Sequence, residues 1–598
     1  MSLLAISCFS AVLLTVAYLT YGPLLGRLLR LRDDVPTPAV SMRDDVDYEP
    51  IDSKFLLSQH FSAIAAAGPV VGPIMAGVMF GWLPALIWIL VGSVFIGGVH
   101  DMTALVASIR HKARSIAEVV RDHMTKRSYV LFLMFVWLAL VYIIVAFTDV
   151  TAEAFVGMQK LENGQIVSGG GIATSSLLYL ALPVLMGLLL RYTKLSIGWA
   201  TLIFLPLVGL SIWAGQFMPF DVATLLHINP AGAKRTWNAA LMVYCLIASV
   251  LPMWLLLQPR GHLGGYFLYI ALAAGMLGVM FGGQTAAYPM FKGWEFTDPD
   301  SKAVSTLFPM LFITIACGAC SGFHSIIASG TTSKQLRRES DAKLIGYGSM
   351  LLEAMVAIIS LFCVMRLGVD DPLFKWPVKP NNVYAQGIGS FMQVANGGFA
   401  ALGLPYKISA TFAVSFGLMA FTTFVYDTLD VCTRLGRYIL QELTGMQGAA
   451  GRWLATGLTA GVPLAFLLGQ PADAKKPLYA IFWNLFGASN QLLAALTLLG
   501  VTVWLWRTRR AAWVLVVTGI PCVFMYIMSM WALMRTISPL VTAVTSGNYA
   551  ALSASPVPWV ASLLAVLGLL ILIEAVIVLT GGMPQPPLAR DERLPVPA

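Results

Sequence analysis

The sequence predicts an all-α polytopic membrane protein, and three observations support that fold class. Of its 598 residues, 58% are hydrophobic and only 11% are charged, and the mean hydropathy is +0.78. Apolar runs of about 20 residues, the length that crosses a bilayer, recur along the whole chain. Glycine and proline interrupt two of these runs internally. A soluble chain could not bury so much apolar surface, so we expect about fifteen transmembrane helices.

Short polar segments separate the predicted spans. The spans cover residues 2–22, 61–80, 83–109, 128–148, 171–191, 196–217, 239–257, 264–284, 305–328, 346–366, 409–430, 451–469, 478–506, 512–533 and 558–580. The run 478–506 is long for one span and leaves room for two segments. The loop 367–408, which contains PLFKWPVKP, is long enough to be either a lid or a packed surface loop.

Basic residues gather in alternate loops, and this distribution sets the orientation. The clusters are Arg27, Arg30 and Arg32; Arg110, Lys112, Arg114, Arg121, Lys126 and Arg127; Lys334, Arg337 and Arg338; and Arg507, Arg509 and Arg510. Loops rich in Lys and Arg stay in the cytoplasm, so we expect a periplasmic amino terminus and a cytoplasmic carboxyl terminus. The net charge of +9 is explained by this bias, and no nucleic-acid partner is expected.

Two interrupted spans divide the chain into similar groups. They contain GPVVGP (68–73) and CGACSGFH (317–324), and four further spans follow each one. Because an odd number of crossings separates them, we expect a five-plus-five inverted repeat with a broken first helix in each half. The alternative is that the glycines only permit close helix packing, as GVMFG (77–81) can. The predicted divisions are a peripheral helix and basic loop (1–60), the first repeat (61–217), a two-helix insertion (218–304), the second repeat (305–506) and peripheral carboxyl-terminal helices (507–598).

The broken helices are the predicted substrate site. A half-helix amino terminus presents unpaired N–H groups and a positive dipole end, which favour a carboxylate. Polar side chains nearby can add hydrogen bonds, or they can tie helices together instead. The candidate substrate-binding residues are Gly68, Pro69, Gly72, Pro73, Ser321, Gly322, Asn484, Asn490 and Gln491.

Ionisable residues within apolar spans usually face a cavity or a partner. The candidates are His100, Asp101, His324, Glu353, Asp427, Asp430 and Glu574. Most lie toward the same end of their spans, with His60 near that level, so they can form one polar cluster. A histidine beside carboxylates suits proton coupling, and the same residue types suit a transition metal. The structural alternative is salt bridging at helix ends, as between Asp430 and Arg434 or between Asp427 and Arg434 or Arg437.

Two further patterns have a functional and a structural interpretation. Thr422 and Thr423 lie where their hydroxyls, with carbonyls freed at the first break, can hold sodium, or they can bond back to their own helix. Cys317 and Cys320 form a CxxC pattern within a span, which favours small-residue packing over metal or redox chemistry. Since other cysteines also fall within apolar runs, no disulfide framework is expected, and no cofactor is implied.

Several long motifs, in the same order, carry a resemblance to a known family. They are GPVVGPIMAG (68–77), GGVHD (97–101), FPMLFITIACGACSGFHSIIASGTTSKQL (308–336), TLDVCTRLGRYILQEL (428–443) and LFGASNQLLA (485–494). From about residue 50 to residue 506 the chain closely resembles the carbon starvation protein A (CstA) family. The resemblance implies a bacterial inner-membrane transporter of peptides or pyruvate, of the broken-helix, inverted-repeat type. Cys320 departs from the family pattern, where a larger apolar residue is expected.

We therefore expect a secondary active transporter that imports a small carboxylate-bearing nutrient with protons, and sodium is the alternative coupling ion. A carboxylate is common to peptides and pyruvate, so the helix-end site does not separate them. The alternatives are an intramembrane enzyme, a subunit of a redox complex, or a channel. The chain lacks HExxH, GxSxG and Walker A patterns, which argues against an enzyme.

Overall fold

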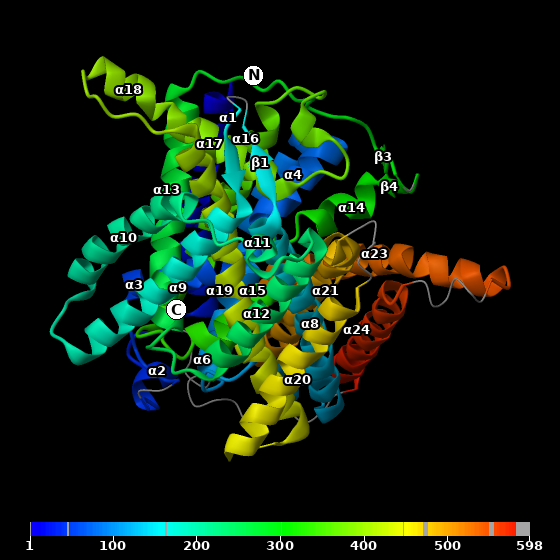
Figure 1. Cartoon of the computed structure of the whole chain (residues 1–598). Helices are drawn as coiled ribbons and strands as arrows, with labels where there is room; N and C mark the ends of the chain where they lie inside the picture. Colours follow the sequence, from blue (N-terminus) through cyan, green and yellow to red (C-terminus); the bar gives the residue numbers. More distant parts are fainter. Residues whose placement is uncertain are drawn as a thin grey trace.

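The computed structural model describes residues 2–44, 47–161, 164–300, 302–446, 448–470, 477–548 and 555–581. Helices dominate this part of the chain (Figure 1). Its named strands form two short hairpins, β1 (Met158–Lys160) with β2 (Ile166–Ser168) and β3 (Glu295–Thr297) with β4 (Val304–Thr306). The predicted all-α class is confirmed.

Twelve helical stretches in the described residues are long and apolar enough to cross a membrane, and a bent pair makes a thirteenth. The twelve are α1 (Leu3–Leu29), α5 to α6 (Trp82–Arg110), α8 (Lys126–Val156), α9 (Gly169–Tyr192), α10 (Ile197–Phe217), α13 (Leu257–Phe281), Glu339–Met365 with α16 (Ser349–Met365), α19 (Ala410–Thr444), α20 (Gly448–Gly469), α21 (Leu478–Arg509), Ala512–Thr545 with α23 (Ile520–Thr545), and α24 (Val557–Thr580). The predicted count of about fifteen is not confirmed.

Two predicted spans fall outside this set for physical reasons. The predicted span 239–257 corresponds to α12 (Pro230–Val250), which begins earlier and carries Lys234 and Arg235 near its start. The predicted span 305–328 is divided into the short helices α14 (Leu307–Thr314) and α15 (Gly322–Ile327). Neither forms one long apolar helix, although both belong to the helical body.

Burial separates central helices from peripheral ones. The most apolar windows of α21 and α19 are 100% and 94% buried inside the protein, whereas those of α10 and α24 are only 33% and 39% buried. Figure 1 shows α9 and α10 on one flank, with α23 and α24 on the other. The outer helices therefore leave apolar faces for lipid. The buried helices α19 and α21 carry polar side chains in the interior.

The first break lies slightly before the predicted one. Helix α3 (Ser53–Ile64) ends, Ala65–Ala67 is non-helical, and α4 (Gly68–Phe80) continues at a bend of 46°. The GPVVGP segment thus opens α4 instead of forming the gap. Proline is tolerated in a first helical turn because its missing N–H has no helical partner there, and Pro69 occupies such a position. Pro73 lies inside α4.

The second break is confirmed where it was predicted. Residues 315–321, between α14 and α15, are non-helical and include Cys317 and Cys320. Side chains of α21 satisfy backbone groups freed there: Asn490 Oδ1 accepts from the Phe323 N–H (2.9 Å), and Gln491 Nε2 donates to the Cys320 carbonyl (2.7 Å). Buried irregular backbone requires such partners.

The structure bears on two segments that the sequence left open, the loop 367–408 and the run 478–506. The loop 367–408 contains the helix α17 (Pro380–Gln393), which packs against α19 and α13 and buries Tyr384 and Phe391. The α17 part of this region is therefore packed, whereas α18 (Ala395–Ala401) has no buried residues. The long run 478–506 is a single helix, α21, since Leu478–Arg509 is continuous.

The predicted basic loops meet at one end of the molecule, which we call the basic end. Arg110 Nη2 donates to the Leu29 carbonyl (2.8 Å), and its Nε lies 2.8 Å from Glu339 Oε1. Arg507 donates to the His123 carbonyl (2.7 Å). At the other end of α8, Lys234 lies 3.0 Å from Asp149 and 3.2 Å from Glu153.

Candidate functional site

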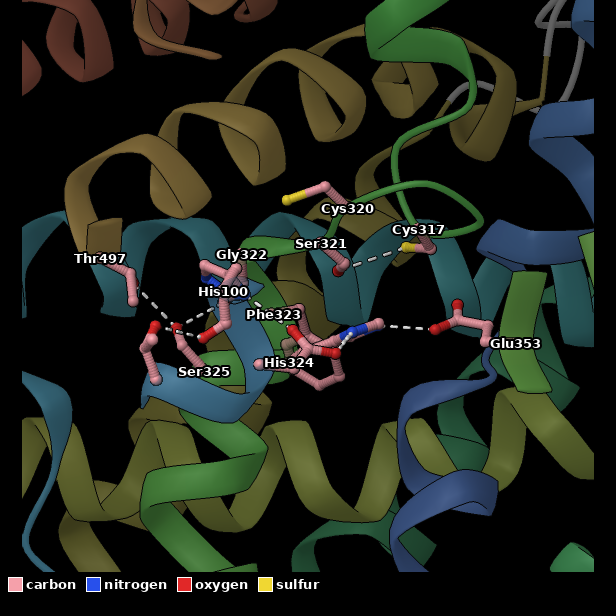
Figure 2. Close-up of polar contacts among 12 residues, drawn as sticks. His100, Cys317, Cys320, Ser321, Gly322, Phe323, His324, Ser325, Glu353 and Thr497 are labelled. Atoms are coloured by element: carbon pink, nitrogen blue, oxygen red, sulfur yellow. Dashed lines mark hydrogen bonds and ion pairs between the residues drawn. The ribbon is translucent and has the colours of Figure 1, made fainter. Parts of the chain in front are cut away.

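Four ionisable side chains from three helices meet in the protein interior, and we call them the histidine cluster. His100 and Asp101 lie on α6 (Gly98–Arg110), His324 lies on α15 just after the second break, and Glu353 lies on α16. Asp101 accepts from His100 through Oδ1 and from His324 through Oδ2, both at 2.7 Å. Figure 2 shows His324 also facing Glu353, with Nε2 and Oε2 at 3.1 Å. The four side chains have no exposed surface.

The histidine cluster contains two imidazoles and two carboxyl groups, so its net charge depends on how many protons it binds. The His324 contact with Glu353 has ion-pair distance without hydrogen-bond alignment, while the contact with Asp101 is a hydrogen bond. A neutral imidazole carries one N–H and cannot offer a proton to both carboxylates. Burying two unprotonated carboxylates with neutral histidines is costly. A proton beyond the neutral-histidine state, on an imidazole or a carboxyl group, would offset that cost.

A second group, which we call the arginine cluster, surrounds Arg260 near the start of α13. Arg260 Nε lies 2.7 Å from Asp427 Oδ1, and its Nη1 contacts both Asp430 and the Tyr244 hydroxyl. The same hydroxyl donates to Asp430 (2.7 Å), and Ser62 on α3 donates to Asp427. Arg260 is only 1% exposed. The cluster joins the first broken helix to α12, α13 and α19.

The ionisable residues predicted to form one polar cluster thus form two clusters. The ion pair predicted between Asp430 and Arg434 is replaced by other contacts. Arg434 donates to the carbonyls of Ala248 (3.0 Å) and Leu251 (2.6 Å) at the end of α12, and no ion pair with Asp430 is recorded in the described residues. Asp430 instead pairs with Arg260, which sequence reasoning missed. Arg260 falls between the predicted spans 239–257 and 264–284, so it was not among the ionisable residues expected within a span.

A small cavity borders the arginine cluster at Asp427. Its lining includes Gln59, His60, Thr332 and Asp427, and its volume of about 10 Å³ is close to the space that one water molecule needs. His60 Nδ1 bonds to Thr332 Oγ1 at 2.8 Å. His60 Nε2 and Gln59 Oε1 are buried and have no hydrogen-bond partner among the described residues. His60 therefore presents an unused ring nitrogen in the wall shared with Asp427.

The two breaks face each other. A Cβ on Gly68 would overlap Cys317, and one on Gly72 would overlap the Thr314 carbonyl. Only glycine permits so close an approach between α4 and the unwound segment. A Cβ on Gly322 would likewise overlap backbone atoms of α21. The residues predicted at the two breaks are therefore neighbours in space.

The polar residues predicted at the second break mostly bond to one another in this state. Ser321 Oγ lies 3.0 Å from Asn490 Nδ2, and Asn490 also caps α15. These contacts are interhelical ties. Gln491 Oε1 has no hydrogen-bond partner among the described residues. Asn484, in contrast, is exposed on α21, six residues before Asn490 and outside this set of contacts.

The remaining predicted residues show the following contacts. Thr422 donates to the Met419 carbonyl of its own helix (3.0 Å), whereas Thr423 Oγ1 is buried and has no hydrogen-bond partner among the described residues. All seven cysteines are free thiols in this structure. Glu574 accepts from Thr125 (2.8 Å), away from both clusters. In the described ranges no three His, Cys, Asp or Glu side chains are placed to hold a metal ion together.

Comparison with solved structures finds membrane transporters of low similarity. A manganese transporter from Eremococcus coleocola gives a TM-score of 0.41 at 12% identity, covering 90% of this chain and 99% of that chain. MhsT in complex with L-phenylalanine gives a TM-score of 0.42 at 13% identity, covering 87% of this chain and 98% of that chain.

Comparison with curated sequences finds closer relatives. A peptide transporter CstA from Escherichia coli (strain K12) is 32% identical over 564 residues, covering 85% of this chain and 78% of the relative. The CstA of Campylobacter jejuni is 30% identical, covering 88% and 79%. The pyruvate/proton symporter BtsT of E. coli is 30% identical, covering 87% and 79%. The family model described as carbon starvation protein CstA matches residues 2–374 and 377–532. The chain is therefore a multi-pass membrane protein that belongs to the carbon starvation protein CstA family.

Proposed function

We propose that this protein imports a small carboxylate-bearing nutrient, a peptide or pyruvate, across the bacterial inner membrane together with protons. Its curated relatives are named as peptide transporters and as a pyruvate/proton symporter, which supports both substrate classes and the coupling ion. The observation that carries the proposal is the contact of buried His324 with both Asp101 and Glu353. A proton held there is shared by α6, α15 and α16.

The charge balance of the interior supports proton coupling. Asp101, Glu353, Asp427 and Asp430 contribute four carboxyl groups to the two clusters, and Arg260 contributes one fixed positive charge. Titratable protons would supply part of the remaining balance, because unpaired buried charges are costly. Gain or loss of a proton would change how α6, α15 and α16 attract each other. Such a change is what couples an ion to alternating access.

The facing breaks support a substrate site between α4, the unwound segment and α21. The amino terminus of α15 follows the second break directly, and the residues proposed to line the site are Gly68, Pro69, Gly72, Pro73, Ser321, Gly322, Asn490 and Gln491. Asn490 and Ser321 bond to each other in this state. Cargo would have to replace those contacts, which makes this a closed arrangement of the site.

The basic end supports a cytoplasmic location for the loops that form it. The amino terminus would then be periplasmic, and the ion pairs of Lys234 with Asp149 and Glu153 would close the periplasmic end of α8. The proposal also includes the five-plus-five repeat, in which residues 61–217 and 305–506 are related by inversion. Consistent with it, each group starts with a helix broken near its middle.

The test is uptake into proteoliposomes of labelled pyruvate and of a labelled dipeptide, each with and without an inward proton gradient. Accumulation that depends on the gradient supports the proposal and identifies the substrate. A sodium gradient in parallel tests the other coupling ion. Failure of both substrates under both gradients would reject import of these nutrients. Asp101→Asn separates coupling from binding, because it should lose gradient-driven accumulation and keep substrate exchange.

A further inference from the structure

A larger cavity lies at the basic end, separate from the two clusters. Its volume is about 270 Å³, near the lower limit for small-molecule sites. The wall combines apolar side chains, such as Phe132, Val136 and Ile326, with charged and hydroxyl groups from the loop before α3, the start of α7 (Ile116–His123), η2 (Ala328–Thr332) and the end of α19. The part of the wall formed by η2 therefore follows His324 in the same helical segment, one to two turns further along the chain.

Two side chains in the wall carry opposite charges without an ion-pair partner. Lys334 contacts the rings of Tyr48 (5.5 Å) and Tyr438 (5.1 Å), and it forms no ion pair among the described residues. Glu442 accepts from the Tyr129 hydroxyl (2.8 Å) and lies 3.3 Å from Ser115 Oγ, again without a basic partner in the described part of the chain. Hydroxyl donors fix the Glu442 carboxylate, and aromatic rings fix the Lys334 ammonium.

The other charges in the wall are already compensated. Glu118 lies 3.2 Å from Arg114 and also pairs with Arg121. A ligand that enters the cavity therefore meets one available ammonium and one available carboxylate. A zwitterion satisfies both, whereas a monocarboxylate satisfies only Lys334 and leaves Glu442 uncompensated.

From this geometry we infer that the cavity is a binding site for zwitterions, in which Lys334 holds a carboxylate and Glu442 holds an ammonium. A short peptide has both groups and enough length to fill the volume, while a three-carbon keto acid has one and leaves most of the space to water. The inference rests on the proposed function, which makes the basic end cytoplasmic and the cavity a station from which a peptide leaves.

The test is equilibrium binding to the purified full chain in detergent, with labelled alanyl-alanine, its N-acetylated form, its C-amidated form and pyruvate as probes. Glu442→Gln is expected to weaken binding of the unblocked and amidated dipeptides about three- to tenfold and to leave the acetylated form unchanged. Lys334→Gln is expected to weaken the unblocked and acetylated forms and to leave the amidated form unchanged. The range is that of a partly exposed ion pair.

Arg338→Gln and Asp34→Asn remove charges at the basic end outside the cavity and should change no affinity. The inference would be overturned if neither variant lost affinity. It would also be overturned if the loss of affinity did not depend on which terminus of the dipeptide is blocked. The wild-type protein gives a second measurement that needs no variant, because equal binding of all four probes would also overturn it. Uptake by proteoliposomes is scored separately: absence of gradient-driven uptake rejects the proposed function, whereas uptake without the terminus-specific pattern rejects only this site.

Discussion

His324 Nδ1 lies 2.7 Å from Asp101 Oδ2, and neither side chain is exposed to solvent. The two residues are 223 positions apart, and one follows the second break while the other lies on α6. Their contact therefore links a helix of each proposed repeat. Since Asp101 also accepts from His100, one carboxylate orients two imidazoles. A change in the protonation of these side chains would therefore alter contacts of α6 and of α15, one helix from each proposed repeat.

Asp101→Asn should uncouple accumulation from the proton gradient. Asparagine keeps the size and can still accept a hydrogen bond, but it removes the charge that balances a proton on the histidines. One coupled proton can drive about tenfold accumulation per pH unit of gradient, and the variant should lose this drive while exchange of labelled for unlabelled substrate continues. Asp34→Asn, on an exposed loop, is the matched control. Gradient-driven accumulation by Asp101→Asn at the wild-type level would remove Asp101 from coupling.

Arg260→Met should destabilise the protein strongly. Methionine matches much of the side-chain length but leaves Asp427 and Asp430 buried without their cation, and breaking a buried ion pair from one side costs about 3–5 kcal/mol. A large fall in the thermal midpoint in detergent is the expected result. Adding Asp427→Asn and Asp430→Asn should recover much of it, because the stranded charges are then gone. A single variant as stable as wild type would show that Arg260 does not compensate these carboxylates.

The sequence predicted the features that depend on composition and local pattern. The unwound segment near Cys317 and the meeting of His100, Asp101 and His324 could be anticipated, because breaks and buried charges stand out in an apolar chain. Features that depend on tertiary contacts could not be anticipated from the sequence. Arg260 fell between two predicted spans, and its partners on α19 are 167 and 170 positions away, so no local pattern connects them.

Tertiary contacts also explain why Arg434 and Asn484 differ from what the sequence predicted. Arg434 has Asp430 four residues before it, yet the carbonyls at the end of α12 are its partners. Helical spacing shows which side chains can meet on one helix, but it does not show which neighbouring helix competes for them. Asn484 and Asn490 belong to one polar motif, and helix rotation exposes the first while it buries the second.

Gly72→Ala should destabilise the contact between the two breaks. An added Cβ would overlap the Thr314 carbonyl, a backbone atom that cannot rotate away. Overpacking of this kind typically costs about 1–3 kcal/mol, and transport should fall with it. Gly461→Ala on α20 is the control, since nothing lies within 4 Å of its added Cβ, and alanine should leave stability equal or slightly higher. Equal thermal midpoints for the two variants would contradict the close approach.

Acidification should destabilise the basic end through His123, which lies on α7 outside the spans. Burial, with His111 and Arg507 nearby, lowers its pKa from 6.5 to about 3. The unfolded chain therefore binds a proton between these pH values that the folded protein does not, so stability is fully present above about pH 6.5 and falls as the pH drops toward 3. One such group contributes about 1.4 kcal/mol per pH unit in this window. His123→Gln should flatten the fall in thermal midpoint between pH 7 and pH 5, and an unchanged slope would assign the acid sensitivity to other groups.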